Sequence, residues 1–129
     1  MPRGKRIEPK LQAGAGDADG VALADRLRAA LPAKGLTEKK MFGGIGFMLN
    51  GNMIAGASKR GLLLRVGKER YREALARTGA RAMEMRGRPV EGYVRIDSAS
   101  LSIVALQNWL ELARAFVETL PPKVRTQRR

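Results

Sequence analysis

The chain has 129 residues and a formal net charge of +13, so it can form one compact domain with a hydrophobic core and a strongly basic surface. It contains no cysteine and no histidine, which excludes disulfides, metal sites built on thiolate or imidazole ligands, and nucleophilic sites that rely on either side chain. No apolar run approaches the roughly 18 residues of a membrane helix, and no apolar stretch follows the basic N-terminus, so we expect a cytoplasmic protein without a membrane partner.

Basic charge is concentrated in three stretches. Residues 1–16 carry four basic groups and one acidic group, residues 121–129 carry four and none, and residues 59–95 carry eleven and four. Two explanations stay open, namely an ordinary solubilising surface or contact with the phosphates of nucleic acid. The candidate contacts are the basic residues of the two ends and three arginines of the middle stretch: Arg3, Lys5, Arg6, Lys10, Arg81, Arg86, Arg88, Lys123, Arg125, Arg128 and Arg129.

Composition sets the expected domain boundaries. Residues 1–16 contain little that a core could bury, and residues 121–129 begin with two prolines, which end a helix. We therefore expect one folded domain at 17–120 between two basic, disordered tails.

A first helix is expected near the start of this domain. Asp17 or Asp19 can serve as its N-cap, and Gly35 can end it. One apolar stripe recurs at helical spacing: Leu23, Leu27, Ala30 and Leu31. A helix with a single apolar stripe needs a sheet to pack against.

The segment KKMFGGIGFMLNGNMIAG at 39–56 predicts a β-hairpin rather than a phosphate-binding loop. Asn50-Gly51 suits a type I′ turn, because both central residues of that turn need positive φ. The glycines of a phosphate loop would lie between a strand and a helix, whereas a strand follows here, and the G-x-G-x-x-G pattern fails at Leu49. Three glycines instead indicate a bulge or a close backbone approach where the first strand starts: Gly43, Gly44 and Gly46.

Pairing outward from this turn assigns two faces to the hairpin, with Phe47 opposite Ile54. The face expected to meet the helices carries Ile45, Phe47, Leu49 and Ile54. The other face carries Met48, Met53 and Ala55, and it is unusually apolar for a solvated surface. Two explanations stay open for this second face, namely ordinary packing within the domain or a binding surface.

Further strands and a helix are expected beyond the hairpin. Short apolar or alternating stretches predict strands at 62–66, 80–85 and 92–96. A basic helix is expected at 68–79, and glycine and proline predict a loop at 86–91.

The clearest element is the last helix. Ser98 or Ser102 can cap it, and two prolines follow its end. Its apolar stripe consists of Leu106, Trp109, Leu110, Ala113, Val117 and Leu120. The expected order is α-β-β-β-α-β-β-α, which predicts an α+β fold with helices packed on an antiparallel sheet.

Two motifs stand out along this order of elements. They are Met41, Phe42, Gly43 and Gly44 with Gly46 two residues on, and Gly87, Arg88, Pro89 and Val90 followed by Gly92 and Tyr93. Together they make the chain resemble, over about residues 20–120, the N-terminal domain of the TfoX (Sxy) competence regulators. The resemblance implies a two-layer α/β sandwich of the kind seen in secretion chaperones, with no cofactor and no catalytic residues. Full-length competence regulators carry a second, helical domain, so the chain is similar to the stand-alone members.

No pattern in the sequence indicates an enzyme. Ser58-Lys59 is the nearest approach to a nucleophile beside a base, but it lies at an expected hairpin end without the G-x-S-x-G or S-x-x-K context. Arg81, Arg86 and Arg88 are better suited to binding an anion, since arginine presents paired donors to phosphate, and a basic solvated loop is the other explanation for them.

The sequence therefore predicts a non-enzymatic regulatory protein without cofactor, metal or small-molecule substrate. On charge, nucleic acid is the first expected partner, with a role in transcription regulation. The alternative is a protein-interaction module that binds another protein, or a second copy of itself, through the face or the edge of its sheet.

Overall fold

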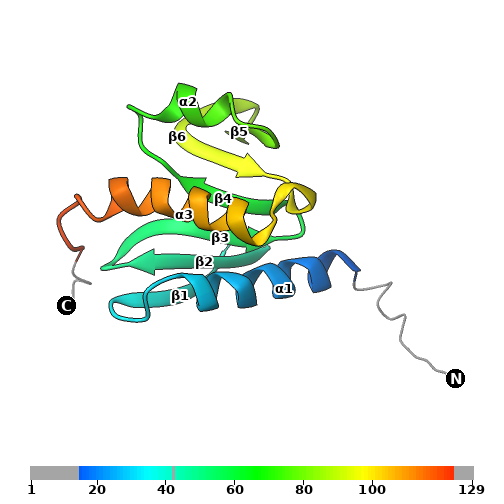
Figure 1. Cartoon of the computed structure of the whole chain (residues 1–129), viewed down its shortest axis with the longest axis horizontal. Helices are drawn as coiled ribbons and strands as arrows, with labels where there is room; N and C mark the ends of the chain where they lie inside the picture. Colours follow the sequence, from blue (N-terminus) through cyan, green and yellow to red (C-terminus); the bar gives the residue numbers. More distant parts are fainter. Residues whose placement is uncertain (1–14, 42, 124–129) are drawn as a thin grey trace, which may run out of the picture.

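The computed structural model describes residues 15–41 and 43–123. In chain order its elements are α1 (Ala15–Ala30), β1 (Leu36–Met41), β2 (Gly44–Leu49), β3 (Asn52–Ser58), β4 (Gly61–Arg65), α2 (Tyr71–Leu75), β5 (Ala80–Met85), β6 (Arg88–Ile96), the 3-10 turn η2 (Ser98–Ser100) and α3 (Ile103–Val117). The strands form one antiparallel sheet in the order β1-β2-β3-β4-β6-β5, and α1 and α3 lie side by side over one face of it (Figure 1). The domain thus has two layers.

The α+β class, the antiparallel sheet and the order of the expected elements are confirmed. The structure adds one strand, β1, which pairs with β2 from Leu36 opposite Leu49 to Met41 opposite Gly44. This strand lies at an edge of the sheet, and its four central residues are exposed. Alternation of apolar and polar residues is therefore missing from its sequence, LTEKKM, which is why no strand was expected there.

Several expected bounds were wrong. The helix expected at 68–79 is the single short helix α2, and the loop expected at 86–91 is only the turn at Arg86-Gly87, because β6 already begins at Arg88. Arg86 and Gly87 both have positive φ, as the central residues of a tight hairpin turn require. A two-residue turn with a proline just after it looks the same in sequence as a longer loop.

The observed ends of the first helix also differ from the expected ones. The helix already includes Ala15, the first described residue, so Asp17 and Asp19 lie inside α1 and neither is its N-cap. It ends at Ala30, whose side chain is exposed, and Gly35 belongs to the turn into β1 instead. The Gly35 carbonyl accepts a hydrogen bond from the backbone N–H of Asn50 at 2.8 Å, which joins this turn to the β2–β3 hairpin.

Most of the two expected tails, at 1–16 and 121–129, lies outside the described residues. Residues 121–123 are described, and we call them the C-terminal clasp, because they are bonded to the β2–β3 turn. The backbone N–H of Lys123 donates to the Asn50 carbonyl at 2.7 Å, and the side-chain amide of Asn52 donates to the Pro121 carbonyl at 3.0 Å. The second bond supplies a partner to the buried Asn52 amide.

The hairpin turn is confirmed, whereas the register behind it was partly wrong. Asn50 and Gly51 have φ values of 52° and 85°, as a type I′ turn requires. The register shifts between Phe47 and Met48, so that Phe47 lies opposite Ala55 rather than Ile54. This irregularity turns Ala55 into the core beside Ile54, away from the face on which it was expected.

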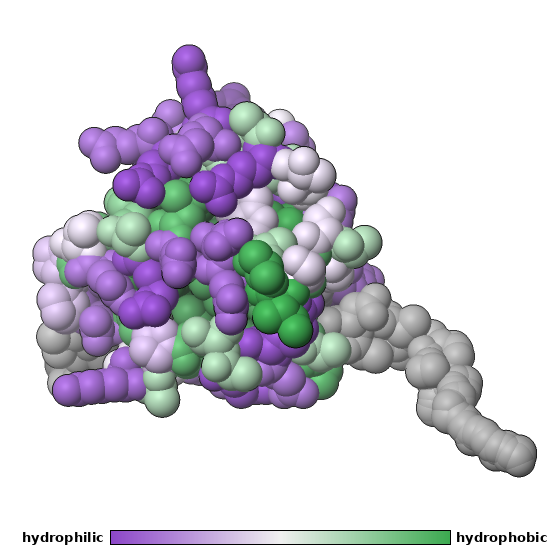
Figure 2. All heavy atoms as spheres, in the orientation of Figure 1, coloured by the Kyte–Doolittle hydropathy of each residue, from purple (hydrophilic) through white to green (hydrophobic). Residues whose placement is uncertain are grey.

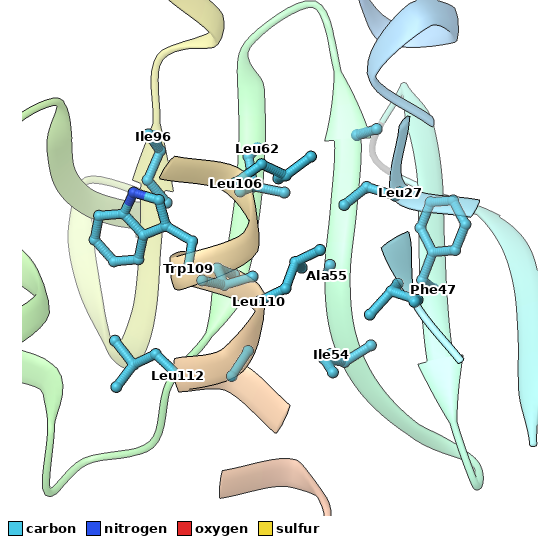
Figure 3. Close-up of a cluster of buried hydrophobic side chains, with 14 of the residues drawn as sticks. Leu27, Phe47, Ile54, Ala55, Leu62, Ile96, Leu106, Trp109, Leu110 and Leu112 are labelled. Carbon is cyan, nitrogen blue, oxygen red and sulfur yellow. The ribbon is translucent and has the colours of Figure 1, made fainter. Parts of the chain in front are cut away.

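The hydrophobic core lies between the sheet and the helices (Figure 3). Phe47, Ile54 and Leu62 on the strands and Leu27 on α1 are completely buried, and Trp109 on α3 is 4% exposed. The apolar stripe of α3 is confirmed except at its end, where Leu120 follows the helix and is half-buried. The helices and one face of the sheet thus bury each other.

Ser102, and not Ser98, is the N-cap of α3, since its Oγ accepts a hydrogen bond from the backbone N–H of Ala105 at 3.0 Å. We expect Ser102→Ala to lower the free energy of unfolding by about 1 kcal/mol in urea denaturation, because this N–H loses its partner. Ser98→Ala, in the turn before the helix, is the matched control and should cost less than about 0.5 kcal/mol. Equal losses in both variants would contradict the capping role.

Candidate binding surface on the open sheet face

The strands alternate between the helix-covered face of the sheet and an open face. Leu62 and Leu64 are completely buried in the core, whereas Leu63 between them points to the open face, in line with Gly56 and Arg95 on the neighbouring strands. A hollow of about 1010 Å³ lies over this open face, with lining residues from all six strands. We call it the methionine groove. Figure 2 shows the side on which α1 and α3 lie, which is largely hydrophilic with one compact hydrophobic patch.

Five of the six methionines of the chain line the groove: Met41, Met48, Met53, Met83 and Met85. Met48 and Met53 are half-buried and lie directly opposite each other on β2 and β3. Met83 is 6% exposed and Met85 is 47% exposed, both on the edge strand β5. Leu63, Val90 and Tyr93 complete an apolar floor.

Two glycines shape this floor. Gly46 and Gly56 lie opposite each other on β2 and β3, and both are buried without a side chain. A Cβ at Gly46 would lie 2.5 Å from the sulfur of Met41, and a Cβ at Gly56 would lie 3.5 Å from the terminal methyl of Met53. The methionine side chains therefore lie flat over bare backbone, which a larger residue at Gly46 would prevent.

Basic side chains border the floor. Lys39, Arg65 and Lys123 belong to the lining, and Arg95 borders a smaller hollow beside it. The guanidinium of Arg65 lies 5.8 Å from the ring centroid of Tyr93 and 5.5 Å from that of Phe116, so two aromatic rings hold its charge in place.

One carboxylate also belongs to the described lining, that of Glu38. Arg28 on α1 donates to it from Nε at 2.5 Å and from Nη2 at 2.8 Å. These hydrogen bonds hold the pKa of the Glu38 carboxyl below its usual range, against the opposing effect of partial burial. The negative charge in the lining is therefore matched by a cation from outside the groove.

Three arginines, Arg60, Arg81 and Arg95, lie at one end of the open face, and we call them the arginine cluster. Arg95 pairs with Arg81 across β5 and β6, and burial, together with the charges of Arg60 and Arg81, lowers the pKa of the Arg95 guanidinium. The Arg81 guanidinium forms an ion pair with Asp97. Three positive charges close together repel one another and destabilise the folded state unless an anion balances them.

The structure does not bring the three arginines expected to bind an anion into one site. Arg81 belongs to the arginine cluster, whereas Arg86 and Arg88 are exposed at the end of the β5–β6 hairpin. Lys123 lies at the edge of the groove. The remaining basic candidates lie outside the described residues: Arg3, Lys5, Arg6, Lys10, Arg125, Arg128 and Arg129.

The motif residues surround the groove or support its strands. A Cβ at Gly44 would overlap the carbonyl oxygen of Ala57, so glycine is needed for the close approach of β2 to β3. The Gly92 carbonyl accepts from the backbone N–H groups of Val66 at 2.8 Å and Gly67 at 3.1 Å, next to Tyr93 on the floor. Phe42 lies outside the described residues. The close backbone approach expected for the first glycines is thus confirmed at Gly44.

Sequence reasoning identified part of this surface. Met48 and Met53 were expected on an apolar face, but Met41, Met83 and Met85 were not connected with it. The spacing of Met83 and Met85, two residues apart in a strand, places both on one face and was the available signal. Which face they share depends on the pairing of β5 with β6, which the sequence does not reveal.

Among the described residues, no helix has both the length and the apolar character needed to cross a bilayer. Over 15–41 and 43–123, no three acidic side chains come together in a way that could hold a metal ion.

Comparison with known proteins places this fold in a family. No match is found among the curated proteins or among the solved structures. The family model of the TfoX N-terminal domain matches residues 29–117, from the end of α1 to the last residue of α3. The matched region includes all six strands and therefore the whole open face. The chain belongs to the TfoX N-terminal domain family.

Proposed function

We propose that this chain is a non-enzymatic regulatory domain that acts by binding another protein in the methionine groove. The observation that carries the proposal is the groove itself, an apolar floor that crosses the sheet and that no described part of the chain covers. Contiguous apolar surface on a monomer commonly marks an interaction site. Methionine suits such a site, because its unbranched and polarizable side chain adapts to partners of different shape.

The contacts of hydroxyl and carboxylate groups support the non-enzymatic part of the proposal. Ser58 Oγ accepts a hydrogen bond from the backbone N–H of Arg60 at 3.1 Å, which is a turn contact. Within the described part of the chain, five carboxylates form ion pairs with arginine: those of Asp25, Glu38, Glu73, Asp97 and Glu118. These contacts explain the groups without an activated nucleophile or a paired acid and base.

Nucleic acid is the second candidate partner, and the arginine cluster favours it. Arg60, Arg81 and Arg95 place three guanidinium groups at one end of the open face, and arginine is well suited to phosphate. A role in transcription regulation would follow from such contacts. Arg81 is already paired with Asp97, however, and Tyr93 is the one aromatic ring in the described lining, which offers little surface for base stacking. Protein is therefore the better supported partner.

The proposal is tested by affinity capture from extract of the native cell, with and without nuclease treatment, using the unchanged chain and the variant Met48→Gln/Met53→Gln. Glutamine keeps the unbranched shape of methionine but adds an amide that opposes apolar contact. We expect the unchanged chain to retain specific proteins and the double variant to retain at least about fivefold less of each, as for the loss of buried apolar contacts at an interface. Quantitative mass spectrometry measures the retained proteins.

The matched control is Ile103→Gln/Val104→Gln, which removes two apolar side chains, 73% and 64% exposed, from α3 on the other side of the domain. This variant should retain the same proteins as the unchanged chain. Melting temperatures of both variants verify that the fold is kept. Equal retention by all three proteins would contradict the role of the groove, and material that is lost on nuclease treatment would give first place to nucleic acid.

A further inference from the structure

Resting on the proposed function, we infer that the occupant of the methionine groove is an acidic amphipathic helix of the partner protein, lying across the strands. Three features of the described residues lead to this inference, namely the direction of the groove, the sign of the charge around it and the adaptability of its floor.

The groove runs across the sheet rather than along one strand. Its apolar floor passes from Met41 on one edge strand through Met53 and Leu63 to Met85 on the other edge strand. Five spacings of about 4.8 Å between strands make about 24 Å, which is the length of a helix of about 16 residues. A helix packed on an apolar sheet face is also a common way in which proteins cover such a face.

The charge around the floor is positive. Lys39 lies on β1, Arg65 near the middle and Lys123 in the C-terminal clasp, and the lysines are exposed. Glu38 adds no free negative charge, because Arg28 holds its carboxylate. A helix with an acidic polar face therefore meets complementary charge beside its apolar stripe, whereas a basic helix meets repulsion.

The same charge disfavours the two occupants that the chain itself could supply. A second copy also has a net charge of +13, so two grooves face to face would bring their basic borders together. The residues that follow the C-terminal clasp in the sequence, 124–129, contain three arginines and no acidic residue. An acidic segment of another protein is the occupant whose charge fits.

The floor can adapt to large apolar side chains of such a helix. Met41 and Met53 lie over Gly46 and Gly56, where backbone alone is beneath them. Methionine changes rotamer at low cost, and when these two side chains move aside, the glycines leave room for a leucine or phenylalanine of the partner. The occupied groove is therefore deeper than the free one.

A displayed library of helices of about 16 residues tests the inference. Each member keeps an apolar stripe of leucine, isoleucine or phenylalanine, and each polar-face position is randomised equally among glutamate, lysine and glutamine. Selection uses the full-length chain at about 150 mM salt, where charges more than about 8 Å apart are largely screened. We expect the selected helices to carry at least about threefold more glutamate than lysine.

Two measurements on the most enriched helix locate its binding. In NMR spectra of the methyl-labelled methionines, the signals of Met48 and Met53 should shift. Lys39→Glu/Lys123→Glu should lower the affinity by at least about tenfold, because it reverses charge at the groove. Lys34→Glu/Lys68→Glu changes the net charge by the same amount at exposed positions outside the groove and should lower the affinity by less than about threefold.

The outcomes separate this inference from the function on which it rests. Helices without a preference for glutamate, together with shifted methionine signals, would overturn the acidic helix but keep the groove as a protein-binding surface. The inference would also fail if no helix were selected while captured proteins still depended on Met48 and Met53, because the partner would then bind in another form. If Lys39→Glu/Lys123→Glu and Lys34→Glu/Lys68→Glu lowered the affinity equally, the preference for glutamate would reflect net charge alone. The inference that the helix binds in the groove would then be wrong. The proposed function itself is decided by the capture experiment alone.

Discussion

Trp109→Ala is expected to lower the free energy of unfolding by about 3–5 kcal/mol, the cost of removing a large aromatic side chain from a core. Trp109 is 4% exposed and packs in one cluster with Ile96 and Leu106 (Figure 3). The guanidinium of Arg77, beyond α2, lies 5.0 Å from its ring centroid. Trp109 therefore joins α3 to both the sheet and the α2 region, and its loss removes a large part of the roughly 5–15 kcal/mol that stabilises a domain.

Urea unfolding followed by far-ultraviolet circular dichroism measures this loss, since the variant has no tryptophan left to report. Trp109→Phe is the control, and it should cost about 1–2 kcal/mol, because most of the apolar volume stays. The unchanged chain should also show blue-shifted tryptophan emission before denaturant is added. Emission typical of tryptophan in water, or a loss below about 1 kcal/mol in Trp109→Ala, would contradict this packing.

Gly51→Val is expected to cost at least about 2 kcal/mol, for two separate reasons. Gly51 has a φ of 85°, a conformation that strains a β-branched residue by about 1–2 kcal/mol. A Cβ there would also overlap the carbonyl oxygen of Lys123, so the C-terminal clasp would have to leave the turn. Thermal and urea unfolding both measure the combined effect.

Gly87→Val separates the two reasons. Gly87 has a φ of 79° in the β5–β6 turn, and a Cβ there would have no atom within 4 Å. This control therefore includes the backbone strain alone, and the difference between the two variants gives the contribution of the clasp. If both lost the same stability, the clasp would contribute nothing to it.

Local patterns predicted those parts of the fold that local chemistry decides. Asn50-Gly51 predicted its turn because few residue pairs accept two positive φ values. The stripe around Trp109 predicted α3 because burial of one helix face imposes helical spacing. The edge strand β1 was not predicted, because its exposed residues are under no such constraint. The irregularity between Phe47 and Met48 was not predicted either, because it arises only when β2 pairs with β3.

The candidate site also combines features that local sequence predicts with features that depend on the pairing of distant strands. Met48 and Met53 were expected on an apolar face, since both lie a fixed distance from the turn. Met41, Met83 and Met85 join them only through the order of the strands, which places β1 and β5 at opposite edges of one sheet. The net charge predicted a class of partner but not the residues that would bind it. A count of arginines does not reveal that Arg81 is already paired with Asp97.

The composition of the methionine groove also makes it sensitive to oxidants. Oxidation converts the thioether of methionine into a polar sulfoxide, and methionine sulfoxide reductases reverse the change. Met85 is 47% exposed and Met48 and Met53 are half-buried, whereas the described core cluster beneath the helices holds no methionine. Reversible oxidation would therefore weaken binding in the groove while the fold that carries it stays intact.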